Sequence, residues 1–103
     1  MISAQDKQLI LSTTKGVSMK ISYSVALQAL KDGKRVAREG WNGKGMFVLL
    51  IRGEAVAQAI QERYGDEHPV RVNDFTMLRG ADGKLSTWVP SSTDQLAEDW
   101  IVL

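Results

Sequence analysis

The chain has 103 residues, 44% hydrophobic and 24% charged side chains, and a net charge of +1 at pH 7, which predicts one globular domain rather than a disordered segment. Since it contains no cysteine and a single histidine, His68, disulfides, thiolate nucleophiles and clusters of Cys or His metal ligands are excluded. The longest apolar run, residues 46–51, is too short to cross a membrane, and no secretory signal is visible, so we expect a cytoplasmic protein.

The beginning of the chain divides into an extension and a helix. Residues 1–20 have no clear period, so we expect an N-terminal extension, followed by one domain over residues 21–103. Residues 22–32 have apolar side chains at helical spacing, which predicts an amphipathic helix that ends at Gly33.

Two strands are predicted on either side of a glycine-rich loop. Residues 34–38 form a short polar strand, and the loop at residues 39–45 contains three glycines. Residues 46–51 show no polar alternation, which is typical of a strand buried on both faces. In so small a protein, we expect a second subunit to cover one of those faces.

The second half of the chain predicts a helix and a hairpin. Residues 54–64 have weak helical spacing. Residues 70–79 predict a strand. Its apolar side chains change from even to odd positions across residues 73–74, as at a β-bulge. The pair Asp82-Gly83 predicts a hairpin turn into a strand over residues 84–89.

The last elements complete a mixed fold. Residues 92–95 fit a capping box that starts at Ser92 and opens a single helical turn. Residues 100–103 predict a final strand. The chain is therefore expected to be a small α+β single domain, with an antiparallel sheet, one main N-terminal helix and short additional helices.

The loop after the first strand is the first candidate binding segment. Trp41 offers a face for a nucleobase, and Asn42 can bond a base edge or a ribose hydroxyl. Gly43 lets backbone N–H groups approach a ligand closely, and Lys44 supplies a charge for a phosphate. A tight strand connection, with Trp41 folded back over the core, explains the same residues equally well.

The segment from Trp88 to Asp94 is the second candidate. Ser91, Ser92 and Asp94 stand at the start of a helical turn, where free N–H groups attract anions. The simpler interpretation is that Ser92 caps the turn and Trp88 packs in the core.

The charged residues near these segments allow two interpretations. Asp94, Glu98 and Asp99 could be paired carboxylates for acid–base chemistry, but an acid favoured by the helix dipole and two solvated acids are the simpler explanation. Arg35 and Arg38 lie on opposite faces of their strand, so at most one of them can serve a common site.

Both candidate segments resemble one family. The sequence Gly40-Trp41-Asn42-Gly43-Lys44-Gly45 lies within residues 23–46, and Trp88-Val89 and Ser91-Ser92-Thr93-Asp94 lie within residues 81–100. Together they resemble a family of small phage and prophage proteins that includes the second class of Thoeris anti-defence proteins. The resemblance excludes the N-terminal extension and is loose over residues 53–79, where the helix looks inserted.

The resemblance implies a non-enzymatic sponge, a protein that binds an immune signal and holds it without cleaving it. The signals are cyclic ADP-ribose isomers, with cyclic dinucleotides as a second class. It further implies a homotetramer with ligand pockets between subunits, no cofactor and no metal, in the cytoplasm of the host bacterium. Trp41 would stack on adenine, and the other ligand-binding residues would be Asn42, Gly43, Lys44, Trp88, Ser91, Ser92 and Asp94.

Two other classes of function stay open. A small phosphodiesterase-like enzyme would degrade the same signal, although the sequence lacks a metal-ligand cluster and a nucleophile–base pair. A nucleic-acid or protein interaction module would use residues 15–44, whose seven basic and two acidic side chains give a balance of +5. A near-neutral net charge of +1, together with only 7% aromatic residues, weakens this class.

Overall fold

The computed structural model describes residues 19–41, 44–65 and 69–103. The N-terminal extension therefore lies outside the described residues, except at its end. The elements are α2 (Tyr23–Lys31), β1 (Val36–Arg38), β2 (Phe47–Ile51), α3 (Gly53–Tyr64), β3 (Phe75–Arg79), β4 (Leu85–Thr87), α4 (Ser92–Leu96) and β5 (Trp100–Val102). The predicted order of elements and the α+β class are confirmed.

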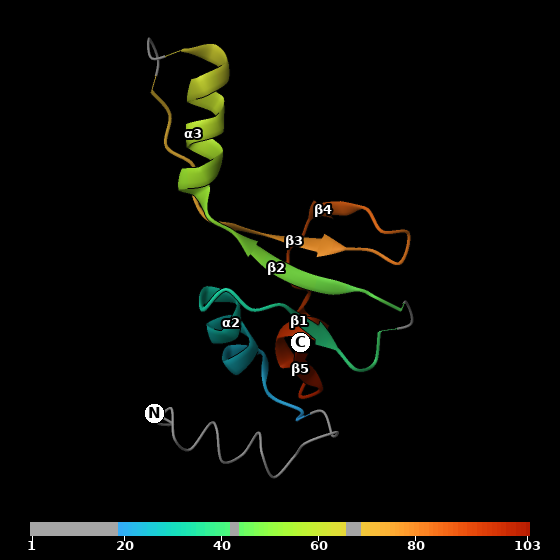
Figure 1. Cartoon of the computed structure of the whole chain (residues 1–103). Coiled ribbons are helices and arrows are strands. Elements are labelled where there is room, and N and C mark those ends of the chain that lie inside the picture. The colour runs from blue at the N-terminus through green and yellow to red at the C-terminus, as the bar shows by residue number, and fades with distance from the viewer. Residues whose placement is uncertain (1–18, 42–43, 66–68) are drawn as a thin grey trace.

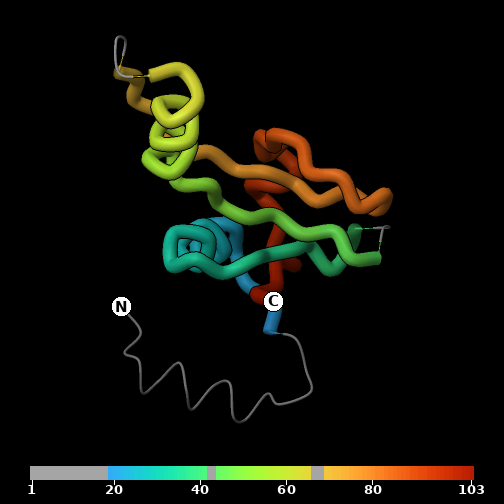
Figure 2. The backbone as a smooth tube through the Cα atoms, turned by 45° about the horizontal axis from the view of Figure 1, so that its top comes forward, coloured from blue at the N-terminus to red at the C-terminus, as the bar shows by residue number. Residues whose placement is uncertain are grey.

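The five strands form one antiparallel sheet in the order β4-β3-β2-β1-β5. The C-terminal strand β5 therefore lies beside β1 at one edge, and the hairpin β3–β4 forms the other edge. Helix α2 packs against β1, β2, β5 and α4, whereas α3 extends away beyond the end of β2 (Figures 1 and 2).

Local sequence signals explain α2. The Ser22 side chain caps the helix by accepting a hydrogen bond from the backbone N–H of Val25. Gly33, at φ 86°, follows the helix in a left-handed conformation that favours glycine. The helix buries Ala26 and Leu30, so the predicted amphipathic helix is confirmed.

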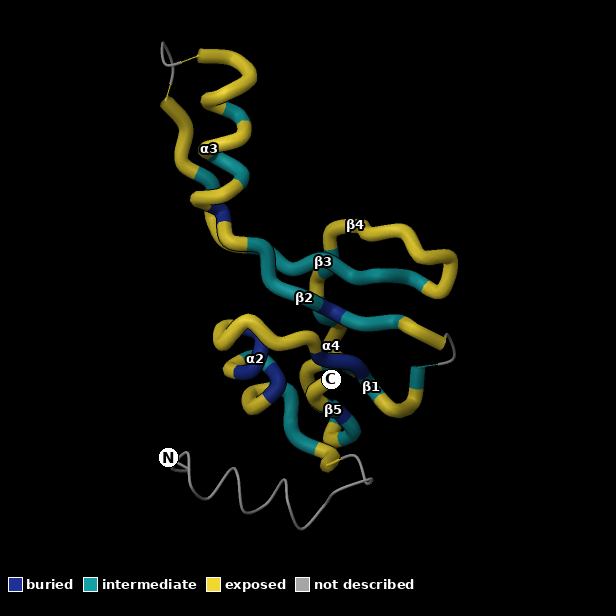
Figure 3. The backbone as a smooth tube through the Cα atoms, viewed as in Figure 1, coloured by how far each residue is buried: buried dark blue, intermediate teal, exposed yellow. Residues whose placement is uncertain are grey.

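The core lies between α2 and one face of the sheet. Its largest fully buried side chains are Trp100, Leu30, Val36 and Val48. Figure 3 shows the buried positions along α2, β1 and the middle of β2. Because side chains alternate along a strand, the neighbours of Val36 and Val48 point to the opposite side of the sheet.

We call that opposite side the outer face. It is apolar but only half-buried: its side chains include Phe47, Leu49, Ile51, Phe75, Met77 and Ile101. Within one chain Val48 alone is fully buried in β2, so burial of both faces of residues 46–51 stays a prediction that depends on a second subunit. The reason is that α2 covers the core face, and α4 packs against α2.

The structure corrects two further predictions and confirms the hairpin. Strand β3 begins at Phe75, and the predicted bulge is absent because Asp74 instead bonds the first turn of α3. Helix α4 is capped by Ser91 rather than Ser92. The hairpin turn is as predicted, with Gly83 at φ 84°.

The predicted helix over residues 54–64 is confirmed as α3. Together with residues 69–74, α3 forms a projection from the sheet. Gly53 is the one buried residue of this helix. A groove of about 690 Å³ runs between α3 and residues 70–72. The projection is therefore far less buried than the rest of the described chain (Figure 3).

Candidate functional site

Trp100 brings the two candidate binding segments together. Its ring centroid lies 5.4 Å from that of Trp41 and 6.0 Å from that of Trp88, both in edge-on contact. The ring of Tyr23 lies 5.4 Å away on the side of α2. Trp41 and Trp88 are each half-buried and pack against the core, so each has both a structural contact and an accessible part.

A hydrogen bond ties the same tryptophan to the second segment. The indole Nε1–H of Trp100 donates to the carbonyl oxygen of Asp94 in α4, at 2.8 Å. A buried indole N–H needs such a partner. Trp100 therefore fixes the position of α4 relative to the sheet as well as the positions of the two flanking indoles.

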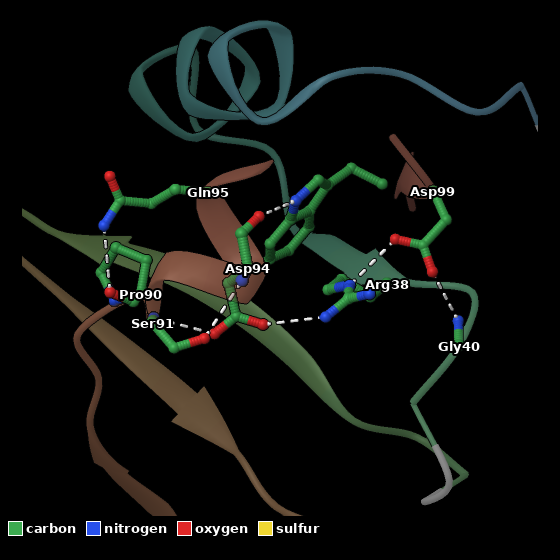
Figure 4. A network of polar contacts seen from close by, with 8 residues as sticks. Arg38, Gly40, Pro90, Ser91, Asp94, Gln95 and Asp99 are labelled. Atoms are coloured by element: carbon green, nitrogen blue, oxygen red, sulfur yellow. Dashed lines mark hydrogen bonds and ion pairs between the residues drawn. The ribbon is translucent and has the colours of Figure 1, made fainter. Parts of the chain in front are cut away.

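Arg38 connects the segments a second time, through charge (Figure 4). Its Nε donates to Asp99 Oδ1 at 2.9 Å, and its Nη1 donates to Asp94 Oδ1 at 3.1 Å. The other Asp99 oxygen accepts the backbone N–H of Gly40 at 3.0 Å. This network joins the end of β1, the start of the Trp41 loop, helix α4 and the residue just before β5.

The start of α4 is a closed capping box. The Ser91 side chain accepts the N–H of Asp94 at 3.1 Å, and Asp94 Oδ2 accepts the N–H of Ser91 at 3.0 Å. Both carboxylate oxygens of Asp94 are thus bonded within the chain. Ser92 is exposed on the first turn of α4.

These contacts perturb the acids. Hydrogen bonding from Arg38 lowers the pKa of Asp99, with the N–H of Gly40 acting in the same direction. Burial works against ionisation of Asp94, but its bonds with Ser91 and Arg38 outweigh this effect and lower the pKa of Asp94. Burial, with the charge of Asp94, raises the pKa of Tyr23. The two carboxylates are therefore held ionised beside Arg38.

The remaining sequence candidates are placed as follows. Asn42 and Gly43 lie outside the described residues. Lys44 is exposed at the turn before β2 and forms no ion pair within the described chain. The interpretation of Asp99 as a solvated acid is wrong, because Arg38 and Gly40 bind it.

Sequence reasoning missed the network around Arg38. One signal was available: Arg38 follows Val36 at a spacing of two, which places it on the core face of β1, where a charge needs a partner. The separation of Arg38 and Arg35 onto opposite faces is confirmed, because Arg38 contacts the acids while Arg35 lies over the Phe47 ring of the outer face.

The arrangement suits binding by stacking and hydrogen bonding. Within residues 19–41, 44–65 and 69–103, no three His, Cys, Asp or Glu side chains are grouped so that they could hold a metal ion. Over the same ranges, no helix is both long enough and apolar enough to span a bilayer.

Comparison with known proteins gives two matches. The model of the Thoeris anti-defense 2-like domain matches residues 21–103, which include α3 as well as both candidate segments. The chain is also 43% identical over 86 residues to Thoeris anti-defense 2 of Bacillus phage SP01, an alignment that covers 82% of this chain and 96% of the relative. The matches are to anti-defence proteins and not to a known enzyme family. The chain therefore belongs to the Thoeris anti-defense 2-like family, and its role is phage anti-defence.

Proposed function

We propose that the chain is a non-catalytic sponge that binds cyclic ADP-ribose isomers, with cyclic dinucleotides as a second ligand class, and so withholds an immune signal from its effector. The observation that carries the proposal is the convergence of the Trp41 loop and the Trp88–Asp94 segment on Trp100. Segments more than forty residues apart are thereby fixed as neighbours in an anti-defence protein.

The chemistry of the convergence suits a nucleotide. Trp41 and Trp88 are half-buried, so each can offer part of an indole to a base while its other contacts hold it in place. Ser92 and Lys44 are exposed three or four positions along the chain from these indoles, and we infer that they bond ribose or phosphate oxygens. Ser91 and Asp94 act chiefly by shaping α4, because their polar atoms already bond to one another and to Arg38.

We also propose that the working form is a homotetramer, with a second copy on the outer face. This face carries half-buried apolar side chains of β2, β3 and β5, with Arg35 and Arg79 around Phe47 at one place, and α2 packs on the other side of the sheet. An apolar surface of this kind marks an interaction site, and a two-fold axis lets one face cover its own copy. Equilibrium sedimentation should give four times the chain mass of 11.4 kDa; a monomer at micromolar concentration would contradict this part.

Capture and release tests the sponge and its enzymatic alternative together. Excess protein is incubated with a panel of cyclic ADP-ribose isomers and cyclic dinucleotides, free ligand is filtered away, and the protein is heat-denatured. We expect at least one compound of the panel to be retained and released chemically unchanged. A compound consumed over time would indicate the enzyme, and a panel that passes entirely through the filter would refute the sponge.

The role of Trp41 is tested by Trp41→Leu, which keeps an apolar contact with Trp100 but removes the stacking surface. Since a base–aromatic stack contributes roughly 1–3 kcal/mol, affinity for the retained compound should fall about 5- to 150-fold. Tyr64→Ala is the matched control, because Tyr64 is an aromatic residue 77% exposed at the end of α3. Unchanged affinity in a folded Trp41→Leu protein would remove Trp41 from the site.

A further inference from the structure

Two arginines converge on one aromatic ring at the outer face of the sheet. The guanidinium carbon of Arg35 lies 4.9 Å from the ring centroid of Phe47, and that of Arg79 lies 6.0 Å from the same centroid. Phe47 and Arg79 are directly paired across β2 and β3, while Arg35 immediately precedes β1. We call these three residues the arginine clamp.

Turn geometry fixes one side of the clamp. Arg79 Nη1 donates to the carbonyl oxygen of Gly45 at 2.7 Å. A Cβ at Gly45 would lie 2.7 Å from that same nitrogen, and a Cβ at Gly83 would lie 3.4 Å from Arg79 Nη2. The guanidinium thus fits against two glycine turns, both at positive φ, and larger side chains at Gly45 would push it away.

Most N–H donors of the two arginines in the clamp remain available to a ligand. Stacking on a ring uses the face of a guanidinium and leaves the N–H donors at its edge directed outward. Arg79 uses one of its donors on Gly45, and Arg35 makes no side-chain hydrogen bond within the described chain. Neither arginine forms an ion pair with a described acid, in contrast to Arg38 and Arg52.

The convergence of two positive charges without a carboxylate calls for an anion. Two cations around one ring, without a local counter-charge, favour the binding of an anion, and the N–H donors of each guanidinium match the oxygens of a phosphate group. Lys44, immediately before Gly45, adds a third unpaired cation and joins the clamp to the loop that begins at Trp41.

Among their described residues, the two aromatic segments offer one unpaired cation, Lys44, which is too little charge for a diphosphate. On the core side, the guanidinium of Arg38 is already neutralised by Asp94 and Asp99. A ligand with a diphosphate therefore needs cations from elsewhere, and two charge-assisted bonds from arginines would supply them.

We propose that the arginine clamp binds the diphosphate of a nucleotide ligand. The identity of the nucleotide rests on the proposed function, whereas the recognition of a diphosphate rests on the clamp itself. The outer face carries the clamp, so a ligand bound there would also lie beside a second copy of the chain packed on that face.

The test compares the native chain with the double variant Arg35→Gln/Arg79→Gln. Inorganic pyrophosphate is titrated into each protein by calorimetry at low ionic strength. Arg63→Gln is the matched control, since Arg63 also stacks on an aromatic ring, at 5.9 Å from the centroid of Tyr64, but does so alone on the projection. We expect pyrophosphate to bind the native chain and the control equally, and the double variant at least about tenfold more weakly.

Two further variants separate a loss of anion binding from a loss of charge alone or of folding. Arg79→Lys keeps the charge but loses the planar fork, so its affinity should fall between those of the native chain and the double variant. If the double variant fails to fold, Arg35→Gln alone serves, because Arg35 is exposed and its side chain makes no hydrogen bond within the described chain. Pyrophosphate binding that is absent from the native chain, or unchanged in the clamp variants, would overturn the proposal.

Capture of the nucleotide panel by the same proteins separates this inference from the proposed function. Pyrophosphate bound through the clamp, with no nucleotide retained, would leave the clamp in place and refute the sponge. A nucleotide retained equally by the native chain and the clamp variants would leave the sponge in place and refute the clamp.

Discussion

The surroundings of Trp100 and the projection around α3 are stabilised by different kinds of contact. Trp100 is fully buried, and three aromatic rings surround it, so that region is stabilised by contacts from many parts of the chain. Helix α3 has one buried residue, Gly53, and is fixed chiefly at its base. Asp74 Oδ1 accepts the N–H of Gly53 at 2.8 Å, and Asp74 Oδ2 receives Arg52 Nη1 at 3.0 Å.

The two regions are therefore sensitive to substitution at different places. Removing a side chain from the surroundings of Trp100 leaves a cavity that many neighbours share. The outer length of α3 can lose side chains with little consequence, whereas its base depends on one close backbone approach. Arg52 extends that base to α2 by donating to the carbonyl oxygen of Lys31.

The largest effect is expected from Trp100→Ala. Truncating a fully buried tryptophan should lower the free energy of unfolding by about 3–5 kcal/mol, measured by urea denaturation. Tyr64→Ala, in the exposed projection, should change it by less than about 0.5 kcal/mol. Similar effects of the two substitutions would remove the contrast between the regions.

An intermediate effect is expected from Gly53→Ala. A Cβ at this position would overlap the carbonyl oxygen of Val72. Helix α3 and residues 69–74 must therefore move apart, which should lower the free energy of unfolding by about 1–3 kcal/mol. Hydrogen exchange should speed up in α3 and residues 69–72, while the amides of α2 stay protected. Gln58→Ala, at an exposed position of α3, is the control, and equal exchange in both variants would contradict the close approach.

The smallest effect concerns pH. Since the folded-state pKa of Asp99 lies below its unfolded value of about 3.9, its stabilising contribution is complete above that value and is lost as the pH falls through the lower, folded-state pKa. At pH 7, Asp99→Asn should cost only about 1 kcal/mol, because partial exposure screens the pair with Arg38. Denaturation midpoints between pH 7 and pH 3 should fall less steeply for this variant than for the native chain. Parallel curves would exclude Asp99 as a source of the acid sensitivity.

Predictions from local patterns succeeded where neighbours in sequence make the contacts. The helix at Tyr23–Lys31 and the hairpin at Gly83 follow from apolar spacing, a capping serine and a glycine turn. The bulge near Asp74 failed because that side chain bonds Gly53, 21 residues earlier. No periodicity in residues 70–79 could reveal that partner.

The candidate site shows the same division. Trp41 was identified from its place among loop glycines and Trp88 from the hydroxyls and acid that follow it, and the family was recognised from the motifs around them. The sequence did not reveal that Trp100 lies between them or that Arg38 holds Asp99, because those pairs are more than ten residues apart and meet only across the sheet. The two arginines of the clamp, 44 positions apart in the numbering, were missed for the same reason.

The order of helices and strands, the amphipathic helix, the turns and the family could be predicted from sequence, because each depends on local spacing or on motifs along the chain. Sequence patterns did not reveal which acids are paired, which face of the sheet stays uncovered or which cations of the described residues lack an ion pair. Those outcomes depend on strand order and register, and a pairing such as Phe47 with Arg79 brings side chains together only after the sheet has formed.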